Sequence, residues 1–99
     1  MTINNQLDGN TLTMKIEGRI DTQTSPDFNK EIEAIPEAVS MLILDFTEVF
    51  YISSAGLRIV LTAQNKMNAK NGEMIIRGAA KNIVNVFKVT GFDTFLTFE

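Results

Sequence analysis

The sequence predicts an α/β domain built on a mixed, mostly parallel sheet of about five strands with three to four helices. After an opening hairpin, strand-like runs alternate with segments whose apolar residues recur at helical spacing. Met41–Leu44 is a continuous apolar run, which is typical of a buried parallel strand. The expected order is β-β-α-β-α-β-α-β. Because 99 residues can enclose one core, we expect a single domain over residues 1–99.

The opening hairpin is predicted from a turn between two short strands. Asp8-Gly9-Asn10 has turn chemistry and separates the expected strands Ile3–Leu7 and Thr11–Glu17. Apolar and polar residues alternate in the second strand, which indicates one face in contact with solvent.

The first helix is predicted from capping signals and apolar spacing. Ser25 is placed as an N-cap and Pro26 as the first helical residue. Phe28, Ile32 and Ile35 then form one apolar face. The later elements are expected as a strand that ends at Asp45, a helix from about Ser54 to Asn71, a strand over Glu73–Arg77, a helix over Ala80–Val89 and a closing strand over Phe95–Phe98.

Composition argues against several classes of function. The chain has no cysteine and no histidine, which removes thiolate metal sites and the commonest general base, so we expect no enzyme, metal or cofactor. The net charge is −3 and the lysines are scattered, which argues against a nucleic-acid partner. No apolar run reaches the roughly 18–20 residues that span a bilayer, and the N-terminus lacks signal-peptide features. We therefore expect a cytoplasmic protein without a membrane partner.

The carboxyl ends of parallel strands are where binding sites gather in open α/β sheets. Three loops are expected there, and they carry Asp21-Thr22, Tyr51 to Gly56, and Gly78-Ala79. In the second loop, Ser53 and Ser54 stand where a long helix begins. One serine in such a place commonly caps the helix. A serine there is also well placed to carry a phosphate, because free N–H groups and the helix dipole stabilise an anion. The local pattern leaves both readings open.

The main motif of the chain runs from Leu42–Val49 through Ile52–Arg58, and an earlier motif is Gly18-Arg19-Ile20-Asp21. Both resemble the signature of STAS domains, which occur in sulfate transporters and anti-sigma-factor antagonists. Sulfate transporters carry the domain after a membrane region, which these residues lack. The sequence is therefore more similar to the stand-alone antagonists.

This resemblance implies a phosphorylation switch that needs no enzyme activity of the chain itself. The serine two positions before Gly-Leu, Ser54, would be phosphorylated by an anti-sigma factor that is a serine kinase, and a PP2C-type phosphatase would reverse the step. The unphosphorylated antagonist would bind the kinase and release the sigma factor. The implied partner-binding residues are Asp21, Thr22, Ser53, Ser54, Ala55, Gly56, Leu57 and Arg58.

The chain departs from the family pattern beside the acceptor. Many antagonists have aspartate before it and serine or threonine after it, whereas this chain has Ser53 and Ala55. Ser53 therefore remains a rival acceptor. Asp21 is open to two readings, as a helix N-cap or as a contact with the kinase. Arg58, one turn after Ser54, is a candidate to pair with a phosphate. The alternative function is a constitutive scaffold or adaptor in a sensory or transport assembly, in which Ser54 only caps the helix.

Overall fold

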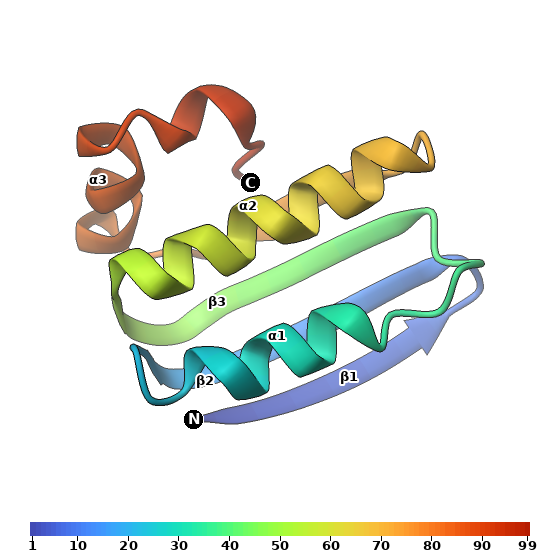
Figure 1. The fold of residues 1–99 in the computed structure, drawn as a ribbon, viewed down its shortest axis with the longest axis horizontal. Helices are drawn as coiled ribbons and strands as arrows, with labels where there is room; N and C mark the ends of the chain where they lie inside the picture. The colour runs from blue at the N-terminus through green and yellow to red at the C-terminus, as the bar shows by residue number, and fades with distance from the viewer.

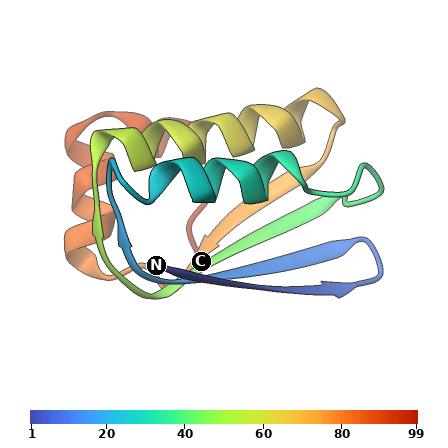
Figure 2. The same ribbon diagram turned by 60° about the horizontal axis from the view of Figure 1, so that its bottom comes forward.

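The computed structural model describes residues 1–99 and shows a four-stranded sheet with α1 and α2 lying over one face (Figure 2). The elements are β1 (Thr2–Asp8), β2 (Thr11–Ile20), α1 (Ser25–Glu33), β3 (Met41–Ile52), α2 (Ser54–Ala69), β4 (Glu73–Arg77), α3 (Lys81–Val89) and the short 3-10 helix η1 (Phe92–Phe95). The strand order is β1-β2-β3-β4, and only β1 is antiparallel to its neighbour. This confirms the mixed, mostly parallel sheet. In Figure 1, α3 stands at one end of the molecule, near the start of α2.

The main core lies between the sheet and the two helices that cover it. Met14 and Ile16 of β2 are fully buried, as are Phe28 of α1 and Val60 and Met67 of α2. Each such side chain contributes about 1.5–3 kcal/mol when it leaves water. This packing holds the first turn of α2 over the ends of β2 and β3.

β3 is much longer than the sequence predicts. The expected end was Asp45, but the strand continues to Ile52. Between Asp45 and Glu48, β3 uses one residue more than β2, which is a β-bulge. Thr47 and Glu48 are therefore both exposed, and the alternation that marks a strand is interrupted. The extension brings the chain to the carboxyl edge of the sheet just before α2.

The predicted fifth strand over Phe95–Phe98 is wrong. Gly91 adopts a left-handed conformation with φ of 80°, and η1 follows it. Only a single parallel bridge joins Phe98 to Ile76 of β4. Because η1 takes up the first part of the expected strand, too few residues remain for a full ladder. The ring of Phe98 packs edge-on against Phe87, with centroids 5.4 Å apart.

The three α-helices occupy the predicted segments, with differences at their ends. α2 begins at Ser54 as expected and ends at Ala69, slightly before the predicted stop. Ser25 is wrongly predicted as the N-cap of α1, because Thr24 holds that position. Ser25 is instead buried, and its hydroxyl donates a hydrogen bond to the Asp21 carbonyl at 2.6 Å. None of the helices has the length and apolar character needed to cross a membrane.

Candidate functional site

The loops after β2 and β3 lie side by side at the carboxyl edge of the sheet. Ile20, the last residue of β2, pairs with Ile52, the last residue of β3. The Ser53 N–H then donates a hydrogen bond to the Ile20 carbonyl at 2.8 Å. The backbone thus brings the loop that starts at Asp21 next to the two serines, as the sequence predicts.

Gly56 allows α2 to begin directly against these strand ends. A Cβ atom at this position would lie 2.6 Å from Cγ2 of Ile20 and 2.8 Å from Cγ1 of Ile52, closer than real Cβ contacts. Leu57 follows with 2% of its surface exposed and packs in the core. Gly56 and Leu57 are therefore buried, and their packing fixes the position of Ser53 and Ser54 at the start of α2.

Ser53 is the N-cap of α2. Its backbone is extended, with φ of −91° and ψ of 173°, and its Oγ accepts a hydrogen bond from the Gly56 N–H at 3.3 Å. Its carbonyl accepts from the Leu57 N–H at 2.9 Å. The side chain is half-buried. The hydroxyl of Ser53 therefore satisfies a helix N–H that would otherwise lack a partner.

Ser54 is the first residue of α2, and its side chain is exposed. Its hydroxyl forms no side-chain hydrogen bond within the chain, in contrast to that of Ser53. The first turn of α2 contains no acidic residue. Free N–H groups and the positive end of the helix dipole favour an anion at such a position. The reading in which Ser54 caps the helix is wrong, because Ser53 does so.

Asp21 organises the loop between β2 and α1. Its Oδ1 accepts hydrogen bonds from the N–H groups of Gln23 and Thr24, each at 3.0 Å, and from the Thr24 hydroxyl at 3.2 Å. In return, the Asp21 N–H donates to the Thr24 hydroxyl at 2.8 Å. The Thr24 N–H is the main cause that lowers the pKa of Asp21. Asp21 therefore fixes the entry to α1 as a carboxylate, although Thr24 holds the N-cap position.

A cluster of Arg19 and two aromatic residues borders this loop, and the sequence-based prediction of site residues missed it. The Arg19 guanidinium lies 4.4 Å from the ring centroid of Tyr51 and 5.9 Å from that of Phe50. Its Nε is 3.5 Å from Oδ2 of Asp21. Phe50 is 59% exposed and Tyr51 is 41% exposed. The available signal was the pair of adjacent aromatic residues, Phe50 and Tyr51, at the start of the segment that leads to Ser53 and Ser54.

A shallow groove of about 450 Å³ lies between the first turns of α1 and α2. It is lined by Thr22, Ser25, Pro26, Asn29, Ala55, Arg58 and Ile59. Three of the predicted partner-binding residues, Thr22, Ala55 and Arg58, therefore share one surface. Arg58 is exposed, forms no ion pair within the chain and is the only charged residue of the lining. No group of three or more acidic, thiol or imidazole side chains is arranged to hold a metal ion.

The chain thus has the order β-β-α-β-α-β-α, and a short segment of small residues leads from the buried strand β3 into the long helix α2. The STAS domain model matches residues 2–99, and the chain belongs to this family.

The chain is similar to curated relatives in sequence and to solved structures in fold. The chain is 26% identical over 86 residues to the anti-sigma-B factor antagonist of Listeria monocytogenes, covering 85% of this chain and 75% of that protein. The unphosphorylated form of the anti-sigma factor antagonist SpoIIAA superimposes with a TM-score of 0.78 at 17% identity, covering 99% of this chain and 87% of that one. The phosphorylated Bacillus SpoIIAA gives 0.77 at 18% identity, with 99% and 91% covered. At these identities the two structures show a shared fold.

Proposed function

We propose that this protein is an anti-sigma-factor antagonist controlled by phosphorylation of Ser54. Its unphosphorylated form binds an anti-sigma factor that is also a serine kinase, and the sigma factor is released. Phosphorylation of Ser54 ends the binding, and a PP2C-type phosphatase restores it. The observation that carries this proposal is the different environment of the two serines: Ser53 caps α2, whereas the side chain of Ser54 is exposed. The name of the Listeria relative supports the class of function.

The local contacts favour Ser54 over Ser53 as the phosphoacceptor. A kinase needs a hydroxyl that can enter its active site, and Ser54 is the more exposed of the two. A phosphate on Ser53 would displace the hydrogen bond from Gly56 and remove a cap worth about 1 kcal/mol. A phosphate on Ser54 breaks no side-chain hydrogen bond of the chain. The switch at Ser54 therefore requires no refolding.

The phosphate acts through charge in this proposal. It adds about −1.5 to −2 at neutral pH, beside a loop that already carries the Asp21 carboxylate. Arg58 lies four residues after Ser54 and therefore on the same face of α2, where its free guanidinium is able to pair with the phosphate. Such pairing would withdraw the cation from the groove. The partner would then meet an anionic surface in place of a neutral serine.

The partner-binding surface consists of the exposed groups around this loop. Asp21, Thr22, Ser54, Ala55 and Arg58 lie at its surface, whereas the buried Gly56 and Leu57 hold the loop in place. The protein acts by binding, in the cytoplasm, and the chemical steps belong to its kinase and phosphatase.

For the test, a lysate of the source cells is fractionated. Each fraction is assayed for a kinase that transfers labelled phosphate from ATP to the purified protein. We expect the active fraction to bind the wild type and Ser54→Ala, and to bind Ser54→Asp at least about tenfold more weakly. Ser53→Ala is the matched control and should still be phosphorylated. Equal binding of the wild type and Ser54→Asp, or phosphorylation of Ser54→Ala, would contradict the switch. A stable partner without any phosphorylation would indicate the scaffold instead.

A further inference from the structure

β1 leaves one edge of the sheet open over its whole length. It pairs only with β2, and the pairing runs from Thr2 to Asp8 without a register shift. Natural proteins protect such edges with proline, lysine or a bulge. β1 has none of these, and its only charged residue is Asp8 at the end of the strand.

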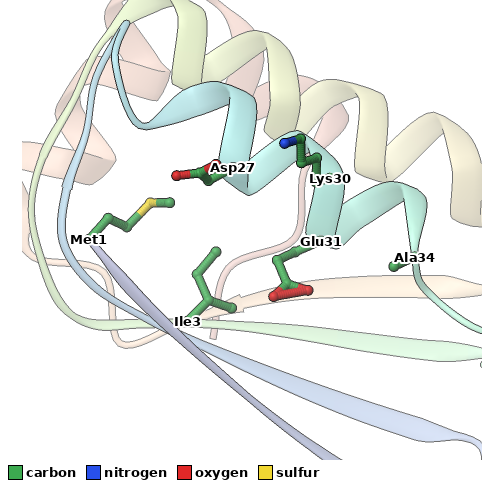
Figure 3. A pocket seen from close by; sticks show the side chains of 6 residues that line it. All are labelled: Met1, Ile3, Asp27, Lys30, Glu31 and Ala34. Carbon is green, nitrogen blue, oxygen red and sulfur yellow. The ribbon is translucent and has the colours of Figure 1, made fainter.

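A groove runs along this open edge beneath α1. Its volume is about 450 Å³, and it is lined by Met1, Ile3, Asp27, Lys30, Glu31 and Ala34. Figure 3 shows Met1, just before β1, and Ile3 of β1 reaching toward the outer side of α1. Leu7, further along β1, is 56% exposed, and Met1 is 37% exposed. The edge therefore carries an uncovered leucine and a groove whose lining is apolar on the side of Met1 and Ile3 and charged at Asp27, Lys30 and Glu31.

We propose that this edge pairs with β1 of a second copy of the chain, in an antiparallel arrangement whose two-fold axis passes through Asn5. Asn5 is the central residue of β1. The two four-stranded sheets then join into one continuous sheet. The contact is isologous, because each copy presents the same surface to the other.

The apolar residues of β1 match one another in this register. Ile3 of one copy lies opposite Leu7 of the other, at the spacing of directly paired residues. Both side chains are on the face of the sheet that carries the helices, because Ile3 pairs with the buried Ile16 and Leu7 with the buried Leu12. Leu7 of each copy thereby covers the groove beside Ile3 of the other.

The charges on α1 are also complementary across the axis. The Asn5 side chain donates a hydrogen bond to Glu31 at 3.4 Å, so this part of α1 lies level with the two-fold axis. The two α1 helices run antiparallel on the same face of the joined sheet, which directs Lys30 of each copy toward Glu31 of the other. Neither residue takes part in any of the three ion pairs within the chain. Lys30 therefore has no ion-pair partner within the chain, and Glu31 accepts only the long hydrogen bond from Asn5, so both can form an ion pair with the other copy.

A second copy is favoured over a different protein because this surface is complementary to itself. It presents Leu7 and the groove that Leu7 fills, Lys30 and the oppositely charged Glu31, and the unpaired edge of β1. Ser53 and Ser54 lie where β3 ends and α2 begins, outside this surface. The inference therefore stands or falls independently of the proposed switch.

The test is sedimentation equilibrium of the purified chain over a range of concentrations. We expect the mass to rise from 11.0 kDa toward twice that value, with a dissociation constant on the order of 10–100 µM, as suits a small interface. Leu7→Lys should keep the chain monomeric. Val89→Lys, a matched change at a residue that is 78% exposed on α3, should leave the dimer intact. A constant mass of 11.0 kDa, or equal effects of the two variants, would overturn the proposal.

A charge exchange tests the register. Lys30→Glu and Glu31→Lys should each raise the dissociation constant several-fold, because each places like charges opposite one another. The double variant restores both pairs across the axis, so its dissociation constant should return to within about twofold of the wild type. A double variant as weak as the single ones would show that α1 does not face its copy in this way.

Discussion

The Oγ of Ser53 accepts a hydrogen bond from the N–H of Gly56 at 3.3 Å. This contact gives two adjacent serines different physical roles. Ser53 stabilises the first turn of α2, while the exposed side chain of Ser54 has no structural task in the loop. Substitutions at the two positions should therefore have different consequences.

Ser53→Ala should lower the free energy of unfolding by about 1 kcal/mol, because it leaves a helix N–H without its partner. Ser54→Ala should change it by less than about 0.5 kcal/mol. Thermal denaturation would show the first effect as a fall of about 4–8 °C in the melting temperature. Equal losses in the two variants would mean that Ser54 shares the capping role.

Gly56→Ala should destabilise the protein by at least about 1–3 kcal/mol, because its new methyl group would overlap Ile20 and Ile52. Asn65→Ala, an exposed position on the same helix, is the control and should cost nothing. Urea unfolding measures both. A Gly56→Ala protein of wild-type stability would show that α2 does not need its close approach to the strands.

Asp21 should make the stability of the chain depend on pH in the acid range. Hydrogen bonds, that from the Thr24 N–H first, lower its pKa in the folded protein below the ordinary value of 3.8. A carboxyl group whose pKa is lower in the folded chain stabilises the fold at any pH above its pKa in the unfolded chain. This stabilisation is lost as the pH falls through its pKa in the folded chain. The stability difference between wild type and Asp21→Asn should therefore shrink between about pH 6 and about pH 2. Urea midpoints that differ equally at both ends of this range would contradict this role.

Lys66 should stabilise the end of α1 from the neighbouring helix. Its Nζ donates hydrogen bonds to the carbonyls of Ile32 and Glu33, both at 3.1 Å. The last carbonyls of a helix lack the usual N–H partner one turn on, and here only the Ile35 N–H, at 3.3 Å, supplements Lys66 at the Ile32 carbonyl. Lys66→Met should therefore cost about 1 kcal/mol and speed amide exchange in the last turn of α1. Lys81→Met, at an exposed lysine of α3, is the control and should do neither.

The sequence predicts the order of the elements well, because most of them bury one regular face. Phe28 and Ile32 recur at helical spacing and are buried in α1, and Met41–Leu44 is the buried start of β3. The serine loop was also predictable, since small residues before a long amphipathic helix mark a strand-to-helix junction.

Other features depend on contacts between distant segments and leave little trace in the local pattern. The bulge near Thr47 arises from pairing with β2, and it conceals the second half of β3. The stacking of Arg19 on Tyr51 joins two strands that are far apart in the chain. Phe98 has the character of a strand residue, but packing against Phe87 and one bridge to β4 place it.

Phosphosite mapping by mass spectrometry tests the role of Ser54 most directly. The purified protein is incubated with ATP and lysate from its source cells, alongside a control substrate that reports kinase activity. We expect one phosphate, on Ser54, and none on Ser54→Ala. A phosphate on Ser53, or none at all while the control substrate is phosphorylated, would contradict the assignment of Ser54 as the switch.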